Sequence, residues 1–315
     1  MRLYRRFSSS FLVREMVEER VSCEDRSSWY RLKAGLLSPL LQSTFMQSSI
    51  DSETRNFISD SIVISNSVCL QLYYAFMSAV LSFFLSKTSI NGILNRGTMF
   101  LFSTKQLRDL LSIPAEWNPA NKRVLDLGAG DGSITEKLAS FYGTIHTTEI
   151  SQVMEWQLRS KNFILEDVEA WSSSLLKFDL ISVLNLLDRH YNPRKLLRDV
   201  YVAALRSNCS VLVAVVLPID QYVEFHPSKR TNRADVKLKV EGNTTEQQAS
   251  SLVENEFLPA GFKVVRWTKL PYLCEGDFKR PFYVLEDAVF LLHPVPTETS
   301  TLSSCDYLNY TKDDL

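Results

Sequence analysis

The second half of the chain alternates short apolar runs with amphipathic stretches, a pattern typical of an α/β fold built on a parallel sheet. The apolar runs predict strands at residues 123–127, 144–148, 178–184, 210–217, 262–269 and 282–292. The amphipathic stretches predict helices at residues 133–141, 151–159, 194–205 and 247–259. Because no clear helix separates the last two strands, we expect them to form an antiparallel hairpin. The polar insertion at residues 220–242 is predicted to be a mobile loop.

Residues 68–85 are the most apolar segment of the chain. They carry no charge and have about the 18 residues that a membrane span requires. Gln71, Ser78 and Ser82 lie on one stripe of this helix, however, and beyond Lys87 the flanks lack a belt of aromatic and basic residues. We therefore predict a buried core or cap helix and no transmembrane span, with a membrane-associated helix as the alternative.

These patterns divide the chain into four regions. We predict a poorly defined N-terminal extension at 1–60, a helical cap at 61–120, the α/β domain at 121–294 and a polar, disordered tail at 295–315. The first fourteen residues hold four arginines and no acid, which is the composition of a weak transit peptide or of a frayed terminus. The sequence is thus compatible with a cytoplasmic, endoplasmic reticulum or mitochondrial location.

The charge balance and the cysteine usage narrow the function classes. Lys and Arg number 35 against 36 Asp and Glu, so no overall positive field attracts nucleic acid, and we expect no nucleic-acid partner. The five cysteines are far apart, and the four histidines form no pair at ligand spacing. We therefore expect neither a metal site nor a disulfide framework.

A glycine turn follows the strand predicted at 123–127. Asp126, Gly128, Gly130 and Gly132 alternate along it, whereas the third glycine of a G-x-G-x-x-G nicotinamide or flavin site is replaced by Ser133. This spacing resembles motif I of the class I S-adenosylmethionine methyltransferases, in which glycines let the backbone approach the ligand closely. A glycine turn without a ligand is the alternative.

Two acids complete this predicted cofactor site. Asp126 is expected to anchor the methionine ammonium of the cofactor, directly or through water. Glu149, at the end of the strand predicted at 144–148, is placed to accept both ribose hydroxyls.

Several separate motifs resemble the DREV family over roughly residues 71–294. They read TSING from Thr88, RGTMF from Arg96, DLGAGDG from Asp126, LNLLDR from Leu184 and LPYLCEGD from Leu270. The resemblance implies a class I S-adenosylmethionine-dependent methyltransferase: a Rossmann-like, seven-stranded sheet with a C-terminal antiparallel hairpin and an N-terminal helical cap. It also implies methylation of the pros nitrogen of histidines in His-x-His motifs of proteins or peptides, where x is small.

The resemblance implies roles for individual residues. Cofactor contacts are expected from Asp126, Gly128, Gly130, Glu149, Asn185 and Tyr272. Asp188 and Tyr283 are expected to face the substrate as catalytic residues. The stretch from Glu166 to Trp171 departs from the family pattern, so the adenine contact stays open between Asp167 and Glu169.

Methylation of histidine places one main demand on the enzyme besides positioning. A neutral imidazole attacks through the pros nitrogen only when the proton sits on the other ring nitrogen. A carboxylate that accepts this N–H selects the reactive tautomer and stabilises the cation that develops, and we assign this role to Asp188. A helix N-cap or a salt bridge to Arg189 is the alternative for Asp188, and core packing is the alternative for both tyrosines.

The acids near the two tyrosines leave another question open. Four acids lie near the tyrosines in the sequence: Glu275, Asp277, Glu286 and Asp287. They form either an acidic rim that accepts N–H donors from the second histidine of the substrate or part of a solvated turn. Two rival functions also remain: a methyltransferase acting on a small molecule or RNA, and a catalytically silent scaffold. The cap hypothesis further predicts that deleting residues 1–60 spares activity, whereas substitutions at 96–100 damage it.

Overall fold

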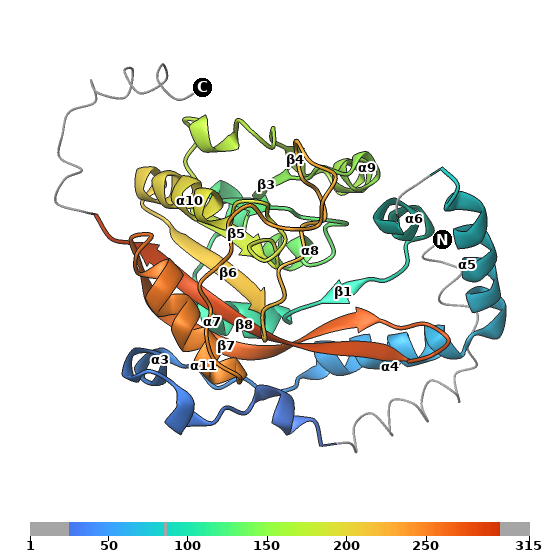
Figure 1. Cartoon of the computed structure of the whole chain (residues 1–315), viewed down its shortest axis with the longest axis horizontal. Coiled ribbons are helices and arrows are strands. Elements are labelled where there is room, and N and C mark those ends of the chain that lie inside the picture. The colour runs from blue at the N-terminus through green and yellow to red at the C-terminus, as the bar shows by residue number, and fades with distance from the viewer. Residues whose placement is uncertain (1–24, 85–86, 297–315) are drawn as a thin grey trace.

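The computed structural model describes residues 25–84 and 87–296, and its centre is one mixed sheet (Figure 1). The predictions for the arginine-rich N-terminus and for residues 297–315 lie outside the described residues. The strand order is β1-β7-β8-β6-β5-β2-β3-β4. The strands are β1 (Met99–Phe100), β2 (Arg123–Leu127), β3 (Thr144–Thr148), β4 (Ile164–Leu165), β5 (Leu180–Leu184), β6 (Ser210–Val216), β7 (Phe262–Glu275) and β8 (Phe282–Pro294).

The parallel part of the sheet confirms the predicted α/β fold class. Strands β2 to β6 run parallel, and β8 lies antiparallel beside β6 and beside β7. Strands β5 and β6 lie in the middle of the sheet with both faces covered, which explains why they read as continuous apolar runs. The carboxyl ends of β2, β3 and β5 meet at one edge, where ligands of such folds bind.

The prediction of seven strands is one strand short. Met99 and Phe100, which we assigned to the helical cap, pair antiparallel with Cys274 and Leu273 of β7. Strand β7 also continues to Glu275 instead of ending near residue 269. A two-residue strand has no periodicity of its own, so only its partner strand reveals it.

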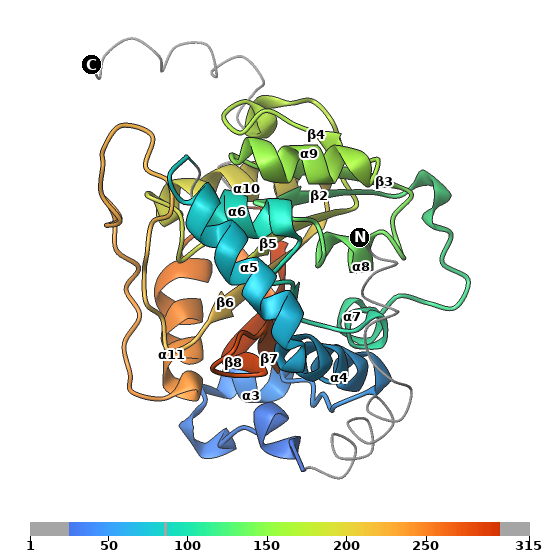
Figure 2. The same ribbon diagram turned by 90° about the vertical axis from the view of Figure 1, so that its right-hand side faces the viewer.

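Helices cover both faces of the sheet, and α5 and α6 lie at one end of it (Figures 1 and 2). The α-helices are α3 (Pro39–Thr44), α4 (Ser52–Asn66), α5 (Val68–Leu81), α6 (Lys87–Leu94), α7 (Thr104–Leu111), α8 (Thr135–Leu138), α9 (Gln152–Ser160), α10 (Pro193–Ser207) and α11 (Thr245–Leu252). A π-helical turn, Val253–Phe257, extends α11. The short 3-10 helices are Ser27–Tyr30, Ala34–Leu36, Pro119–Asn121 and Trp171–Ser173.

Alternate residues of each strand build two cores. Val211 and Val213 of β6 belong to the core beneath α3, α10 and α11, whereas Leu212 and Ala214 belong to the core beneath α7, α8 and α9. This alternation follows from the period of two in a β-strand. The sheet is therefore packed against a core on each face, and this packing holds the residues at its carboxyl edge in place.

Part of the region expected to be poorly defined belongs to the core. Leu41 of α3 and Ile58 of α4 are fully buried, and the indole N–H of Trp267 donates to the Leu41 carbonyl at 2.8 Å. Phe45 also forms a parallel bridge with Trp267 of β7. The burial of these residues argues against the expectation that deleting residues 1–60 spares activity. α3 has only six residues, too few for a periodic pattern.

Helix α5 differs from the buried helix that we expected. Gln71 and Tyr74 face inward, and the Gln71 amide donates to the Ile64 carbonyl at 3.1 Å. Leu72 and Phe76 are instead 58% and 67% exposed. Within the described ranges no single helix has the length and hydropathy of a membrane span; α4 and α5 reach them only as a pair bent by 77°.

Candidate active site

The glycine turn after β2 lies at the carboxyl edge of the sheet. The N–H groups of Gly128 and Ala129 donate to the Thr148 carbonyl at 3.0 and 3.1 Å, which ties the turn to the end of β3. Gly128 has a φ of 70°, and a Cβ there would lie 3.0 Å from the Leu186 side chain. Gly130 has a φ of 57°, but a Cβ there would meet nothing within 4 Å. The turn thus presents its bare backbone to open space at Gly130.

Asp126 lies beneath this turn and not at its surface. It is 2% exposed, and its two carboxylate oxygens accept hydrogen bonds from the hydroxyls of Thr135 (2.6 Å) and Ser182 (2.7 Å). Burial raises the pKa of Asp126 to about 6, although both hydroxyls oppose the shift. The geometry favours the water-mediated form of the predicted ammonium contact, and Asp126 also fastens the turn to β5 and α8.

Glu149 is held by three backbone donors at the end of β3. One carboxylate oxygen accepts from the N–H groups of Ile150 and Ser151, and the other accepts from Gly130, each at 2.9 Å. Burial raises the pKa of Glu149, and these three bonds oppose the shift. A carboxylate has about four acceptor positions, so one stays open on the oxygen that faces Gly130. Accepting both predicted ribose hydroxyls would require the release of one backbone donor.

Asn185 occupies a left-handed turn, with φ 53°, directly after β5. Its amide nitrogen donates to a carboxylate oxygen of Asp287 on β8 at 2.8 Å. Among the described residues, its buried side-chain oxygen has no hydrogen-bond partner. A buried polar atom of this kind normally indicates a missing partner, which fits the predicted role of Asn185 in ligand binding.

Asp188 follows in the same turn and is 4% exposed. One of its oxygens lies 3.6 Å from Nε of Arg189, and the other has no hydrogen-bond partner among the described residues. Burial raises the pKa of Asp188, and the Arg189 guanidinium partly offsets the shift. The predicted salt bridge is therefore present, whereas the N-cap of α10 is Asn192 and not Asp188. The salt bridge occupies only one oxygen and leaves the other available to a donor.

The two tyrosines sit at different depths in the hairpin of β7 and β8. Tyr272 is 6% exposed within the core, where burial raises its pKa above the usual range, and its hydroxyl contacts the Met99 sulfur. Tyr283 is near the hairpin turn and donates its hydroxyl to Asp277 at 3.1 Å. Tyr272 therefore has the packing role that we kept as an alternative, in addition to any ligand contact.

The four acids of the hairpin do not form one rim. Asp277 caps the turn by accepting from the backbone of Lys279, and Glu286 is exposed and paired with Lys269. Asp287, the next residue after Glu286, points to the other face of the sheet and is fully buried beside Asn185. The solvated-turn interpretation therefore holds for Asp277.

The cap meets the site along α6 and the segment that follows it. α6 contacts α9, where the Gln157 amide donates to the Gly92 carbonyl. The Arg96 guanidinium lies 5.5 Å from the Tyr74 ring and acts electrostatically on Asp277 and Tyr283. These contacts place the cap beside α9, the helix that follows β3, and beside the hairpin turn.

The insertion at 220–242 is attached to the turn that carries Asp188. The N–H of Tyr222 donates to the Asp188 carbonyl at 3.1 Å, and Arg189 pairs with Glu224 at 2.7 Å. The N–H of Asp235 donates to the Tyr191 carbonyl at 2.9 Å. The insertion is therefore fixed against the turn that carries Asp188, whereas its sequence predicts a mobile loop.

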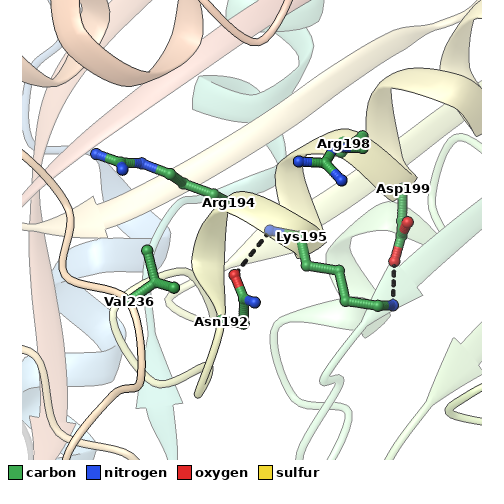
Figure 3. Close-up of a pocket in the computed structure, with 6 residues that line it drawn as sticks. All are labelled: Asn192, Arg194, Lys195, Arg198, Asp199 and Val236. Atoms are coloured by element: carbon green, nitrogen blue, oxygen red, sulfur yellow. Dashed lines mark hydrogen bonds and ion pairs between the residues drawn. The ribbon is translucent and has the colours of Figure 1, made fainter. Parts of the chain in front are cut away.

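A surface cavity of about 410 Å³ lies at the start of α10 (Figure 3). It is lined by Asn192, Arg194, Lys195, Arg198, Asp199 and Val236. Figure 3 shows the Asn192 oxygen accepting from the Lys195 backbone and Lys195 reaching Asp199. No predicted site residue lines this cavity, so we do not assign the chemistry to it.

A family model named DREV methyltransferase matches residues 29–294. The chain belongs to the DREV methyltransferase family. The match begins well before the motifs that suggested the resemblance, consistent with the burial of α3 and α4 in the fold. As a DREV methyltransferase the protein uses S-adenosylmethionine as its methyl donor.

Solved structures with low sequence identity resemble this DREV methyltransferase in outline. A candidate RNA methyltransferase from Pyrococcus horikoshii is 13% identical in sequence, with a TM-score of 0.41. The aligned region covers 72% of this chain and 98% of the other protein. A SAM-dependent methyltransferase from Methanosarcina mazei is 16% identical in sequence, with a TM-score of 0.36. The aligned region covers 57% of this chain and 96% of the other protein. Neither likeness bears on the acceptor of this family member.

The residues at the carboxyl edge fit S-adenosylmethionine. Gly130 offers an open backbone that a Cβ would fill, and Glu149 keeps one acceptor position beside it. The unpartnered oxygens of Asn185 and Asp188 add acceptors for a ligand that carries N–H or O–H donors. Asp126 holds this cradle together from below.

Sequence reasoning missed the supports of the site. Thr135 and Ser182 fix the Asp126 carboxylate, and Arg189 links Asp188 to the insertion. Ser182 interrupts the apolar run of β5, and a polar residue inside a buried strand was the one available signal for it. Thr135 gave no comparable signal.

Replacing Gly130 with alanine should lower the affinity for S-adenosylmethionine by about tenfold or more, because the new methyl group occupies the open side of the turn. The left-handed φ also costs about 1–2 kcal/mol of folding stability. Titration calorimetry and thermal unfolding measure the two effects separately. Gly35→Ala is the matched control, since that Cβ also meets nothing within 4 Å but lies outside the site. Equal affinities of the wild type and Gly130→Ala would contradict the assignment of the cradle.

Proposed function

We propose that this DREV methyltransferase methylates the pros nitrogen of histidine in His-x-His motifs of proteins or peptides, where x is a small residue. One observation carries the proposal: Asp188 is buried, and one of its carboxylate oxygens has no hydrogen-bond partner among the described residues. Asp188 follows the same strand end as Asn185. The family resemblance of the LNLLDR motif supports the same assignment.

Asp188 is suited to accept the N–H of a neutral imidazole. Its free oxygen is shielded from water, which strengthens a hydrogen bond to an incoming donor. Accepting the N–H leaves the pros nitrogen unprotonated, and the negative charge stabilises the ring as it becomes positive. Arg189 holds the second oxygen at 3.6 Å and so orients the carboxylate.

The other residues of the site position the reactants. When bound, S-adenosylmethionine supplies an activated methyl group, so positioning is the enzyme's main task. Gly128, Gly130 and Glu149 would hold this cofactor on one side of Asn185, and Tyr272 would support it from the hairpin. Tyr283 and the cap segment near Arg96 would border the peptide, since both lie beside the hairpin turn.

The test uses isotope-labelled S-adenosylmethionine and two peptides, one with Ala-His-Ala-His and one with both histidines replaced. Fragmentation mass spectrometry locates the methyl group and identifies the ring nitrogen. We expect label only on the pros nitrogen of the first peptide. Cofactor binding without transfer to that peptide would overturn the proposed acceptor and favour a small molecule or RNA, while absence of cofactor binding would favour a silent scaffold.

A further inference from the structure

The Asn185 and Asp287 side chains are joined by one hydrogen bond and have one spare oxygen each. The Asn185 amide nitrogen donates to one Asp287 oxygen at 2.8 Å. The Asn185 side-chain oxygen and the second Asp287 oxygen are both buried and both lack a partner within the described part of the chain. Two planar groups joined on one edge commonly pair on the other edge too, but here both remaining atoms are acceptors if Asp287 is ionised.

The surroundings of Asp287 disfavour a negative charge. Its side chain is fully buried within β8, where Asp287 lies opposite Val216 of β6 and Leu270 of β7. Within residues 25–84 and 87–296, no Lys, Arg or His side chain forms an ion pair with it. An unpaired ionised carboxylate buried in this way is costly, and a neutral carboxyl group is the usual outcome.

The charged and titratable groups around Asp287 come from the turn after β5, from β7 and from β8 itself. Asp188, in the turn after β5, adds a negative charge, and Tyr272 of β7 interacts electrostatically with Asp287. Arg189 acts on Tyr272 but is committed to Asp188 and Glu224. Glu286 faces away from Asp287 and pairs with Lys269. None of these groups supplies a compensating cation to Asp287.

We propose that Asp287 is a positioning residue that carries a proton in the folded protein and donates it to the side-chain oxygen of Asn185, so that the two side chains form a closed, doubly hydrogen-bonded pair. The proton satisfies both unpartnered oxygens at once, and the second lone pair of the Asn185 oxygen stays open to a donor of the cofactor. The pair then holds Asn185 in its left-handed conformation at the cofactor edge of β5. It also leaves Asp188 as the charged acid of this cluster.

The titration of Asp287 agrees with this arrangement. Burial raises the pKa of Asp287 to about 8, and the neighbouring Asp188 adds to the shift; the Asn185 hydrogen bond and the backbone N–H groups of Val215 and Ala288 oppose it. Between the ordinary pKa of 3.8 and this value the folded protein holds one proton more than the unfolded chain. Folding stability therefore falls as pH rises through this window. Asp126 contributes in the same direction up to about pH 6, and burial also raises the pKa of Glu149 and Asp188, so the contribution of Asp287 is read from the difference between the wild type and an Asp287 variant.

The first test measures thermal unfolding of the cofactor-free protein between about pH 5 and pH 9. In Asp287→Asn, the new amide can donate to the Asn185 oxygen and accept from its nitrogen without any proton. We expect the wild type to lose stability between about pH 6 and pH 8, and Asp287→Asn to lose clearly less over that interval. Asp199→Asn, on α10 and paired with Lys195, is the matched control and should follow the wild type. Identical pH profiles of the wild type and Asp287→Asn would overturn the proposal.

The second test measures binding of S-adenosylmethionine by calorimetry and rests on the predicted role of Asn185 as a cofactor contact. Asp287→Asn should bind within about threefold of the wild type at pH 7 and should not weaken at pH 9, whereas the wild type should. Asp287→Leu, which cannot pair with Asn185, should bind about tenfold more weakly. If Asp287→Asn already binds as weakly as Asp287→Leu at pH 7, the negative charge is needed and the proposal is wrong. The peptide methylation assay tests the acceptor separately, because neither readout here involves the peptide.

Discussion

Replacing Asp188 with asparagine should lower the turnover of peptide methylation by about a hundredfold or more, while the affinity for S-adenosylmethionine should change by less than about threefold. The asparagine side chain keeps the size of Asp188 but loses the charge that stabilises a developing imidazolium. Its amide can also rotate to present a donor to the imidazole, which favours the wrong tautomer. Single-turnover kinetics with labelled cofactor, alongside calorimetry, separates the two quantities.

The matched control for this prediction is Asp199→Asn. Asp199 is also an aspartate with a basic partner, Lys195 at 2.7 Å, but it is half-buried on α10 and is not one of the predicted site residues. It should retain the turnover of the wild type. Unchanged turnover in Asp188→Asn, or an equal loss of cofactor affinity and turnover, would show that Asp188 does not select the tautomer.

Deletion of residues 1–60 should abolish stable folding and, with it, cofactor binding. The deletion removes α3 and most of α4, including the fully buried Leu41 and Ile58, and leaves the Trp267 indole N–H without its partner. The free energy lost by exposing this core exceeds the net free energy of unfolding of a typical domain, which is only about 5–15 kcal/mol. The loss of circular dichroism and of a cooperative unfolding transition would show the effect.

A point substitution tests the same interface without a deletion. Leu41→Ala should lower the free energy of unfolding by about 2–5 kcal/mol, since it leaves a cavity under Trp267. Leu40→Ala is the control from the same helix: Leu40 is 38% exposed, so its loss should cost much less. Both values come from urea denaturation. Equal stabilities of the two variants, or a well-folded protein lacking residues 1–60, would mean that α3 and α4 are not part of the core.

The central sheet was predictable because its strands carry strong local signals. The runs at β2, β5 and β6 are buried on both faces, so they stand out as apolar segments without reference to their neighbours. The glycine turn was equally clear, because left-handed backbone at Gly128 and Gly130 restricts the residue type. The cofactor class and the family followed from such short-range patterns.

The elements that the sequence did not reveal depend on partners distant in the chain. The strand at Met99 and Phe100 exists because β7 extends to meet it, and α3 is fixed by Trp267 more than two hundred residues later. α5 shows the reverse problem: its mostly apolar sequence did not show which side faces inward, and Gln71 of its short polar stripe is buried.

The site residues also fall into two groups, those predicted from local sequence patterns and those whose environment depends on distant segments. The sequence by itself determined the cofactor turn, Glu149 and the turn that carries Asn185 and Asp188, because each follows a strand end that local patterns predict. Only the tertiary structure decided that Asp126 is sealed beneath the turn, that the insertion at 220–242 borders Asp188, and that Asp287 meets Asn185. Burial and hydrogen bonding between separate strands set the charge and orientation of these groups, and neither is encoded in the spacing of residues along one segment.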